Sequence, residues 1–371
     1  MKYVIAPDSF KESMTAGEAA AAMEEGIRSV DPAAECVIIP MSDGGEGFAH
    51  AVAAAWGAEW IELDSVDALG RPIRAGYGLS GHEAVVDIAS SAGLEQIAPR
   101  DRDVARSSSA GLGILVRDAI ARGARRVVIG LGGSATNDAG AGMLVALGAR
   151  LLDARGRQLA GTLGELGRVA SVDLSGLPRE LRSAGFLVAS DVTNPLTGPR
   201  GATAVFGPQK GVPLDAVAEY DAALGRFALL VGSRQLAERP GAGAAGGVGF
   251  ALTAVLNAEI RPGIDVVSGL TDLPQAMSGA DLVLTGEGSV DAQTLDGKAP
   301  AGIARIAARA GVSVLLFAGR LGRGSEALLE HGVTELHQIV DEDVPLSDAL
   351  ANGFANLREA TAEAVRRHLA K

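Results

Sequence analysis

Short apolar runs alternate with longer amphipathic stretches along most of this chain, and this alternation limits the available folds more than any other feature. The apolar runs are short enough for buried strands and lie at 2–6, 35–40, 126–130, 186–190, 281–286 and 314–319. Amphipathic stretches with helical spacing begin at about residues 16, 45, 138, 298 and 347. Strands that alternate with helices predict parallel sheets with crossover helices, and hence an α/β fold.

Three local patterns refine this prediction. Residues 59–89 show period-two patterning with recurring turn signals, which predicts antiparallel strands. Thr15 and Glu18 have the spacing of a capping box, which predicts a helix that runs to about Val30. Within "LLDARGR", residues 154–156 predict a hairpin turn.

The length and punctuation of the chain indicate more than one domain. A chain of 371 residues predicts two domains, at most three, each able to bury its own core. Polar, proline-containing segments near 96–103 and 257–265 are the expected junctions.

Composition excludes several classes of protein. The net charge of −12 argues against a basic face for nucleic acid. Cys36 is the one cysteine, which excludes a disulfide framework within the chain and fits a reducing cytoplasm. The first apolar run is too short for a signal peptide. The uncharged stretch 241–258 is rich in glycine, and we expect a loop leading into a buried helix there rather than a membrane span.

Polar residues follow the predicted strands, where ligands bind in parallel α/β sheets. These strand ends are Asp8–Lys11, Asp43–Glu46, Leu131–Asp138, Asp191–Pro195 and Glu287–Asp291. Any one of them alone reads better as a helix cap. Together they favour a binding or catalytic site.

The lysines are concentrated near the same segments. Five of the 33 basic residues are lysines, and two of them, Lys2 and Lys371, lie at or beside the chain ends. Lys11, Lys210 and Lys298 each lie beside Gly, Asp or Ser. An ammonium group meets phosphate as a compact point charge. The alternatives are chance and, for Lys210, a solvated turn.

The segment "GLGGSA" at 130–135 fits the dinucleotide pattern G-x-G-x-x-A, with Asp153 downstream as the acidic residue. The hairpin predicted at 154–156 argues against that assignment. Gly132 and Gly133 would equally allow close approach of phosphate, Ser134 adds a hydroxyl, and a predicted helix follows. The chain has no G-x-x-x-x-G-K-[ST] motif, so it is not a P-loop enzyme.

The histidines do not form a catalytic or zinc-binding pattern, since they are scattered at 50, 82, 331, 337 and 368. Carboxylates, hydroxyls and lysines remain. This inventory suits Mg²⁺ and phosphoryl transfer, in which positioning and charge neutralisation supply most of the catalysis.

Six segments, taken in order, resemble the type-1 glycerate kinases. They include "GGSATND" and "VFGPQKG", and they lie at 6–16, 40–48, 129–148, 190–211, 240–249 and 281–304. This chain departs from the family in having Glu12 for Gly, Phe48 for Thr and Ser289 for Arg. Ser289 removes a cation, for which Lys298 and Arg320 are the candidates to compensate.

The resemblance implies an ATP- and Mg²⁺-dependent kinase that phosphorylates D-glycerate, usually giving 2-phosphoglycerate. It implies a flavodoxin-like parallel-sheet domain formed by both chain ends, which we place at 1–90 and 265–371. A second α/β domain would be inserted at 91–264, with the site in the cleft between the two. We expect a cytoplasmic monomer or homodimer without nucleic-acid or membrane partners.

Roles can be assigned to individual residues as hypotheses. For the base that takes the hydroxyl proton we favour Asp191, with Asp8 second, and Lys11 assists at the phosphoryl group. The residues expected to bind the substrate are Ser9, Lys11, Asn194 and Lys298. Those expected to hold the nucleotide phosphates are Gly132, Gly133, Ser134, Asn137 and Lys210. Those expected to bind Mg²⁺ are Glu287 and Asp291, followed by Asp43 or Asp138.

Other interpretations stay open at this point. Asp43 and Asp138 read equally as helix caps, and Glu287 as a residue that bonds amides within its Gly-Glu-Gly loop. For the whole chain the alternatives are a glycerate 3-kinase, an NAD-dependent hydroxy-acid dehydrogenase and a non-catalytic organic-acid sensor.

Overall fold

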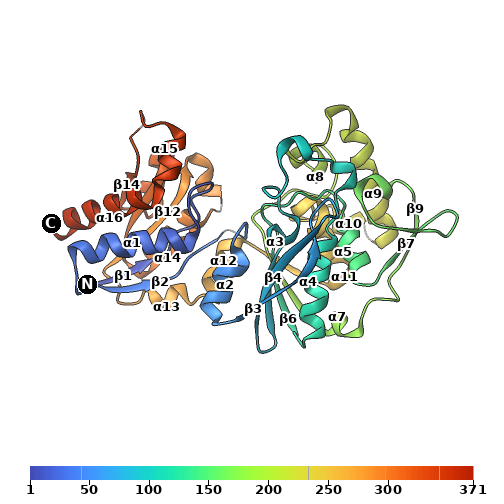
Figure 1. Ribbon diagram of the computed structural model, residues 1–371, viewed down its shortest axis with the longest axis horizontal. Helices are drawn as coiled ribbons and strands as arrows, with labels where there is room; N and C mark the ends of the chain where they lie inside the picture. Colours follow the sequence, from blue (N-terminus) through green and yellow to red (C-terminus); the bar gives the residue numbers. More distant parts are fainter. Residues whose placement is uncertain (43, 233, 297, 342, 371) are drawn as a thin grey trace. The chain divides into compact units, whose positions relative to one another are not determined.

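The chain divides into two compact units in the computed structural model, which describes residues 1–42, 44–232, 234–296, 298–341 and 343–370. The first unit comprises Met1–Asp43 and Pro262–Lys371, and the second comprises Gly44–Arg261. Both ends of the chain therefore lie in one unit, as the blue and red segments of Figure 1 show, and the other unit is an insertion.

The first boundary differs from the expected one between residues 90 and 91. Strands β3 (Glu59–Val66), β4 (Pro72–Ser80) and β5 (Glu83–Asp87) belong to the second unit, because β5 pairs in parallel with β6 (Arg126–Gly130). The junction expected near 96–103 lies inside the second unit as well. The second boundary, expected between 264 and 265, falls between Arg261 and Pro262.

The first unit is built on a parallel sheet with the strand order β14-β13-β12-β1-β2. Its strands are β1 (Lys2–Ile5), β2 (Glu35–Ile38), β12 (Leu282–Val290), β13 (Ser313–Leu321) and β14 (Glu335–Gln338). Counted along the chain within this unit, the spatial order is 2-1-3-4-5, which is the flavodoxin-like order. The predicted fold of this unit is confirmed.

Helices cover this sheet, and the residues that begin the first of them behave as predicted. The helices are α1 (Ala16–Val30), α12 (Gly263–Leu270), α13 (Leu273–Ala276), α14 (Ala299–Ala310), α15 (Leu346–Ala351) and α16 (Gly353–Leu369), with 3₁₀ turns η6 (Ala292–Asp296) and η7 (Ser325–His331). Thr15 Oγ1 accepts a hydrogen bond from Glu18 N at 3.2 Å, and Glu18 Oε2 accepts one from Thr15 N at 2.8 Å. The capping box is confirmed. The last helix, expected from about Ser347, is divided into α15 and α16 at Asn352.

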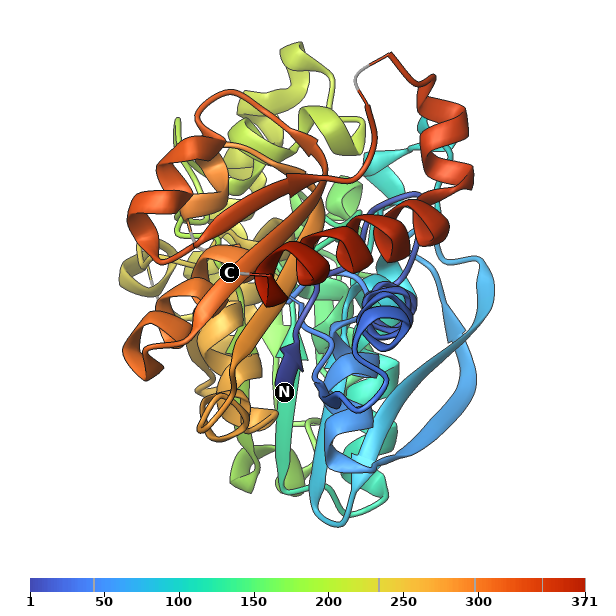
Figure 2. The same ribbon diagram turned by 90° about the vertical axis from the view of Figure 1, so that its left-hand side faces the viewer.

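The C-terminal helix packs closely against α1 in the first unit, and Figure 2 shows α16 in dark red in front of the sheet. A Cβ atom at Gly26 of α1 would lie 2.5 Å from the carbonyl oxygen of Arg358 in α16. Leu357 and Val365 of α16 are fully buried in the same cluster as Met23 of α1. The two ends of the chain therefore share one hydrophobic core.

The second unit is built on a mixed sheet with the strand order β11-β10-β6-β5-β4-β3. β10 (Gly185–Ala189) and β11 (Glu259–Arg261) continue the parallel part begun by β5 and β6, whereas β3, β4 and β5 pair antiparallel. A small antiparallel sheet has the order β8-β7-β9, from β7 (Arg150–Asp153), β8 (Gln158–Leu159) and β9 (Val169–Asp173). The antiparallel strands predicted at 59–89 and the hairpin turn predicted at 154–156 are confirmed.

Short helices connect these strands. They are α2 (Phe48–Trp56), α3 (Ala89–Ala92), α4 (Ala110–Ala121), α5 (Ala141–Ala146), α6 (Leu163–Leu166), α7 (Arg179–Ser183), α8 (Ala202–Phe206), α9 (Val217–Val231), α10 (Arg234–Ala237) and α11 (Val248–Leu256). The 3₁₀ turns are η1 (Pro99–Asp101), η2 (Val104–Arg106), η3 (Pro208–Lys210), η4 (Leu214–Ala216) and η5 (Ala244–Gly247). Within the described ranges, none of the helices is long and apolar enough to cross a membrane.

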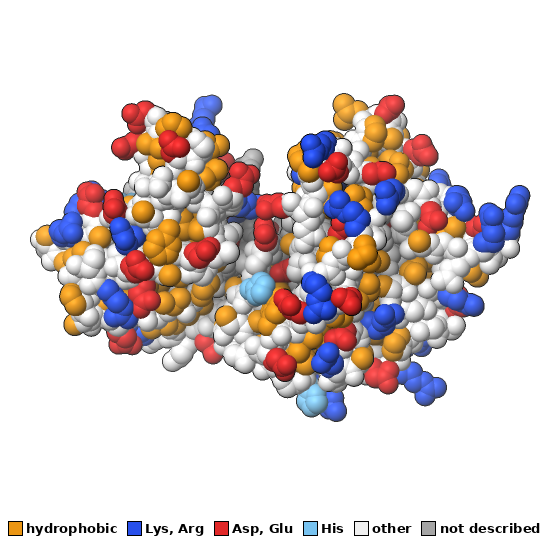
Figure 3. Space-filling model, in the orientation of Figure 1, with side chains coloured by type: hydrophobic (Ala, Val, Ile, Leu, Met, Phe, Trp, Pro, Cys, Tyr) orange, Lys and Arg blue, Asp and Glu red, His pale blue; other side chains and the backbone are white. Residues whose placement is uncertain are grey.

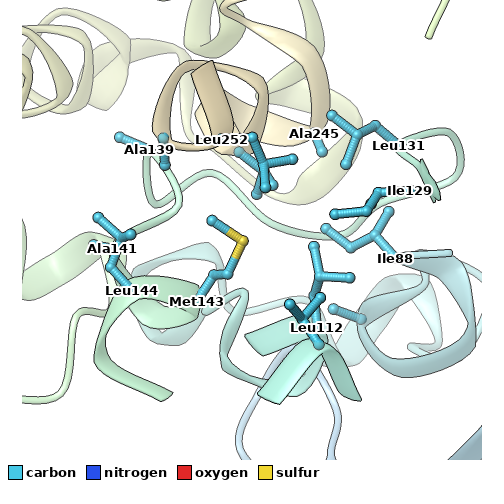
Figure 4. Close-up of a cluster of buried hydrophobic side chains, with 14 of the residues drawn as sticks. Ile88, Leu112, Ile129, Leu131, Ala139, Ala141, Met143, Leu144, Ala245 and Leu252 are labelled. Carbon is cyan, nitrogen blue, oxygen red and sulfur yellow. The ribbon is translucent and has the colours of Figure 1, made fainter. Parts of the chain in front are cut away.

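The core of the second unit reaches the loop that follows β6. Leu131 and Ala139 of this loop are buried, and Figure 4 shows them in one cluster with Met143 of α5, Leu112 of α4 and Leu252 of α11. These apolar side chains fix the loop from beneath, because each is almost fully removed from water. The polar residues between them are thereby held at a defined place.

Candidate active site

Residues 131–140, called here the site loop, join β6 to α5 in the second unit. Backbone hydrogen bonds hold the loop to neighbouring segments: Ala135 N to Ala92 O at 2.8 Å, Leu94 N to Gly133 O at 2.8 Å, and Ala139 N to Gly246 O at 2.9 Å. The helix that follows, Ala141–Ala146, is short, so its dipole adds less than the sequence suggested.

The two glycines predicted to admit phosphate lie in different surroundings. Gly132 N donates to Gly44 O at 2.9 Å, and a Cβ atom on Gly132 would lie 2.5 Å from Gly45 Cα. Gly132 is therefore required by the packing of protein backbone against protein backbone. Gly133 is exposed and has a φ of +70°, and the nearest atom to a Cβ there would be Ala89 Cβ at 3.4 Å. Of the two, Gly133 forms the exposed part of the loop.

Lys210 of η3 lies beneath the site loop and is bonded to it. Its Nζ donates to Ser134 Oγ at 2.9 Å and to Thr136 O at 2.8 Å, and the residue is only 5% exposed. Burial lowers the pKa of the Lys210 ammonium to about 7, and the charge of Asp138 opposes that shift. The solvated-turn interpretation is wrong. The structure brings together two residues that the sequence assigned to one task, Ser134 and Lys210.

Asp138 is fully buried and joins the beginnings of two helices. Its Oδ2 accepts hydrogen bonds from Ser109 N at 2.7 Å, Ser109 Oγ at 2.8 Å and Gly142 N at 3.0 Å, and its Oδ1 accepts one from Gly140 N at 3.0 Å. Burial raises the pKa of this carboxyl group, and the hydrogen bonds oppose the rise. The helix-cap interpretation accounts for Asp138 without a metal.

Asn137 is also fully buried, although the sequence assigned it to the nucleotide. Its Nδ2 donates to Thr203 Oγ1 of α8 at 3.0 Å, and its backbone N donates to Ser107 Oγ at 3.3 Å. The side chain of Asn137 is therefore turned to the interior and links the site loop to α8.

Asp191 follows β10 at the same edge of the sheet as the site loop. The register of the parallel pair places Ala189 opposite Gly130, and Leu131 N donates to Ala189 O at 3.2 Å. Asp191 itself is half-buried. Asn194 holds its own turn, since its Nδ2 donates to Arg200 O at 2.8 Å and its carbonyl accepts from Gly243 N at 2.9 Å.

In the first unit, Asp8, Ser9 and Lys11 lie in the turn after β1. Asp8 N donates to Gly286 O at 2.8 Å, and Asp8 Oδ1 accepts from Ser9 N at 2.6 Å. Asp8 is 8% exposed, whereas the Lys11 side chain is exposed. Glu12, at the position where the family usually has Gly, has a φ of +62°. That left-handed backbone is the physical reason for a glycine preference there.

Glu287 and Lys298, assigned from sequence to a metal and to the substrate, form an ion pair with each other. Glu287 Oε1 accepts hydrogen bonds from Lys298 Nζ at 3.2 Å and from Thr294 Oγ1 at 3.0 Å, and Lys298 Nζ also donates to Ser289 O at 3.3 Å. Asp291 N donates to Thr294 Oγ1 at 3.2 Å. Lys298 therefore balances a carboxylate that is 9% exposed.

Asp43, one of the candidate metal ligands, lies outside the described residues. Among the residues that are described, no group of three or more His, Cys, Asp or Glu side chains is arranged to hold a metal ion. Mg²⁺ commonly takes one or two carboxylates and completes its shell with water and phosphate. The prediction for Glu287 and Asp291 stays a prediction.

Sequence reasoning missed three residues that support these segments. Thr294 bridges Glu287 and the backbone of Asp291. Thr136 offers the carbonyl that Lys210 binds, and Asp87 accepts bonds from Ala49 N at 2.9 Å and Ser90 N at 2.7 Å. Asp87 was detectable as the carboxylate that ends an apolar strand. The Thr294 hydroxyl and the Thr136 carbonyl follow no sequence pattern that would have pointed to them.

The face drawn in Figure 3 mixes charges of both signs. Its described Lys and Arg side chains are interspersed with Asp and Glu side chains. Nucleic-acid-binding proteins instead present a clustered basic stripe. On the face that Figure 3 draws, the described basic side chains do not gather into such a stripe.

Comparison with known proteins gives one consistent result. Residues 3–369 match the model of the glycerate kinase family. A glycerate kinase of Bacillus subtilis is 44% identical over 368 residues, which is 98% of this chain and 96% of the relative. A glycerate 2-kinase of Escherichia coli is 40% identical over 370 residues, with 97% and 96% covered. A crystal structure from Salmonella typhimurium LT2, provisionally assigned as glycerate kinase 2, is 42% identical with a TM-score of 0.86 and covers 100% of this chain and 98% of that one. The resemblance predicted from the motifs is confirmed, and the chain belongs to the glycerate kinase family.

Proposed function

We propose that this enzyme transfers the γ-phosphoryl group of ATP to the 2-hydroxyl group of D-glycerate, giving 2-phosphoglycerate and ADP. Family membership supports phosphorylation of glycerate, and the name of the Escherichia coli relative supports the 2-position. The structural observation that carries the phosphoryl part is the bond between buried Lys210 and Ser134 in the site loop.

The site loop is proposed to bind the phosphates of ATP. Lys210 donates a hydrogen bond to Ser134 Oγ, so the proton of the Ser134 hydroxyl is directed to another acceptor. A phosphate oxygen is such an acceptor, and the exposed Gly133 backbone lies beside it. Gly132 and Asn137 keep the loop in shape, and the Lys210 charge lies just beneath it.

The substrate is a small carboxylate, so the enzyme must supply a cation and hydrogen-bond donors for it. We assign Lys11 and Ser9 to that role, because the turn after β1 presents an exposed ammonium beside a half-buried hydroxyl. Lys298 contributes less directly than its sequence context suggested, since it is paired with Glu287. Asn194 supports the turn next to Asp191.

Asp191 is proposed as the base, with Asp8 as the alternative. The base takes the proton from the 2-hydroxyl as that oxygen attacks the γ-phosphorus, and the bond from the γ-phosphorus to the bridging oxygen of ADP breaks. A positioned base contributes about 10²- to 10⁴-fold to the rate. Asp191→Asn should therefore lower kcat by about this factor while leaving the folding transition nearly unchanged. If Asp8→Asn lowered kcat by this factor and Asp191→Asn did not lower it, Asp8 would be the base instead of Asp191.

Mg²⁺ is proposed to accompany ATP, and the donor chemistry of the first unit fits it. Glu287 and Asp291 are hard oxygen ligands within one short segment, and the Thr294 hydroxyl bonds to both residues. When bound, Mg²⁺ neutralises charge on phosphate oxygens. The protein's own contribution is to hold the Glu287 carboxylate through Thr294 and Lys298, and the backbone of Asp291 through Thr294.

The dehydrogenase alternative loses its support in the structure. Asp153, the acidic residue of the supposed dinucleotide fingerprint, lies at a hairpin and accepts bonds from Arg155 N at 2.8 Å and Arg157 N at 3.0 Å. A ribose-binding acid would instead end a second parallel strand. β7, which ends at Asp153, pairs antiparallel with β8 and β9.

Phosphorus NMR of the purified enzyme with ATP, Mg²⁺ and D-glycerate tests the proposal. A new phosphomonoester signal that grows as ADP appears is expected, and proton coupling should split it into a doublet from the single proton on carbon 2. A triplet would place the phosphate on carbon 3 and overturn the regiochemistry. A folded enzyme that leaves ATP intact in the presence of D-glycerate and forms no ester would overturn the kinase assignment for this substrate.

A further inference from the structure

We propose that the junction between α15 and α16, residues 350–353, is a positioning element that fixes the turn carrying Ser9 and Lys11. This inference rests on the proposed function, in which that turn binds the carboxylate of glycerate. The junction lies near the other end of the chain, and nothing in its sequence indicates a catalytic role. The contacts of Ser13 and Gly353 carry the argument.

The turn is fixed at its two ends and exposed at its tip. Phe10 N donates to Met14 O, and Ser13 N and Met14 N donate to Phe10 O, each at 2.9 Å. Phe10 is 2% exposed and Met14 is 7% exposed, whereas Lys11 and Glu12 are exposed. The place of the Lys11 ammonium therefore depends on where the backbone of residues 10–14 is held.

Ser13 attaches the turn to α15. Its Oγ donates a hydrogen bond to the carbonyl of Leu350 at 2.8 Å, across 337 positions of sequence. Leu350 lies in the last turn of α15, which ends at Ala351. In Figure 2 the dark blue segment that follows β1 passes beside the place where α15 and α16 meet.

Gly353, the first residue of α16, allows the helix to touch the turn. A Cβ atom on Gly353 would lie 2.1 Å from Ser13 Oγ, 2.7 Å from Met14 Cε and 3.3 Å from Ser13 Cβ. Its φ does not lie in the left-handed region, so conformational freedom does not explain this glycine. The absence of a side chain explains this glycine, because it permits the close approach of α16 to Ser13.

The opposite side of the turn is held by glycines of β12. A Cβ atom on Gly288 would lie 3.2 Å from Lys11 N, and one on Gly286 would lie 3.1 Å from Phe10 Cζ. The turn is thus enclosed between β12 on one side and the α15–α16 junction on the other. Movement of Ser13 and Met14 away from a methyl group at Gly353 would disturb the Ser13 bond to Leu350 and shift the turn that carries Lys11. Displacement of a binding group by about 1 Å can cost about 10²-fold in rate.

Steady-state kinetics of Gly353→Ala, Ser13→Ala and the double variant test the proposal. Gly353→Ala should raise KM for D-glycerate about tenfold while changing KM for ATP much less. Ser13→Ala removes the atom that the new methyl group meets, so the double variant should recover part of the loss. Val365→Ala is the matched control, because Val365 is a fully buried residue of the same helix that lies twelve positions further along. It should lower stability without a selective effect on D-glycerate.

The results separate this inference from the proposed function. An equal rise in both KM values, or the same profile in Val365→Ala at matched stability, would overturn the positioning role. The positioning role would also be wrong if the effects of Ser13→Ala and Gly353→Ala on KM for D-glycerate simply multiplied in the double variant. If Gly353→Ala does not fold, Ser13→Ala alone remains decisive, since loss of the Leu350 bond should raise KM for D-glycerate severalfold. Ser9→Ala and Lys11→Met test the proposed role of the turn itself. If neither variant raises KM for D-glycerate, that role is wrong. If both raise it and Gly353→Ala does not, only the positioning role of the junction is wrong.

Discussion

Lys210 Nζ lies 2.9 Å from Ser134 Oγ, although 76 positions of sequence separate the two residues. The lysine comes from a 3₁₀ turn and the serine from the loop after a central strand. Both are more than nine-tenths buried, and the ammonium donates a second bond to Thr136 O. The Lys210 ammonium therefore holds the backbone and a hydroxyl group of the site loop directly, and any effect on a ligand is transmitted through that loop.

Replacement of Lys210 by Met should weaken ATP binding. The variant leaves Ser134 Oγ and Thr136 O without their donor, so the site loop loses two bonds that fix it, and displacement of a binding group by about 1 Å can cost about 10²-fold. KM for ATP is therefore expected to rise about tenfold to a hundredfold in steady-state assays. Lys2→Met is the control, because Lys2 Nζ also donates to a carbonyl, that of Ser278, but near the surface. A folded Lys210→Met enzyme with unchanged KM for ATP would contradict the assignment.

Stability should increase with pH above neutrality through the same lysine. Burial lowers the pKa of Lys210 from 10.5 to about 7 in the folded protein. Between these two values the unfolded chain binds the additional proton, so the free energy of unfolding rises with pH, by at most about 1.4 kcal/mol per pH unit. Denaturant titrations at pH 7, 8 and 9 should show this rise in the parent enzyme and a smaller one in Lys210→Met. Parallel curves for the two proteins would show that Lys210 titrates normally.

Asp138→Asn should destabilise the second unit even though the two side chains have nearly the same shape. The amide nitrogen replaces one of the two oxygens, so its N–H groups face either the donors of Ser109 and Gly142 or the donor of Gly140. A loss of about 3 kcal/mol in the free energy of unfolding is expected. Asp64→Asn, at a side chain 94% exposed, should have almost no effect. If added Mg²⁺ stabilised the parent enzyme but not Asp138→Asn, the structural interpretation of Asp138 would be wrong.

Glu12→Gly should stabilise the turn after β1. Glu12 has a left-handed backbone, which disfavours residues with a Cβ atom and suits glycine. A gain of about 0.5–1 kcal/mol in the free energy of unfolding is expected. Glu12→Ala removes the same charge but keeps the Cβ atom, so it should give no such gain. Equal stabilities of the Gly and Ala variants would show that the charge, not the backbone, decides.

Local features of the fold were predictable because their causes are local. The capping box of Thr15 and Glu18 and the hairpin after Asp153 depend on residues fewer than five positions apart. The first domain boundary was not predictable in this way. Residues 59–87 form the same antiparallel strands in either domain, and only the long-range pairing of β5 with β6 assigns them to the second unit.

In the candidate site, too, features with local causes were predictable and features that depend on long-range packing were not. Strand ends indicate which segments carry polar residues, and the sequence predicts one shared task for Ser134 and Lys210, which the structure places in contact. The sequence does not show that Gly132 serves backbone packing, that Asn137 is fully buried, or that Lys298 is balanced by Glu287. Each of these depends on which side of a loop faces the interior. That property is decided by tertiary packing and leaves no periodicity in the sequence.

The discontinuous first unit has a consequence for the order in which the chain folds. Thr285 Oγ1 donates to Ala6 O across 279 positions, so β1 must wait for most of the chain to be synthesised. The inserted unit has no such delay, and its own ends converge: Arg261 is the register partner of Ala189, and a Cβ atom on Gly44 would lie 2.8 Å from Ala189 O. Once the insertion has folded, its first and last residues, Gly44 and Arg261, both lie beside Ala189 of β10. Folding of the insertion thus removes most of the loop-closure entropy that would otherwise oppose the pairing of β1 with β12. During synthesis on the ribosome, a folded insertion would therefore keep the chain segments before and after it close together.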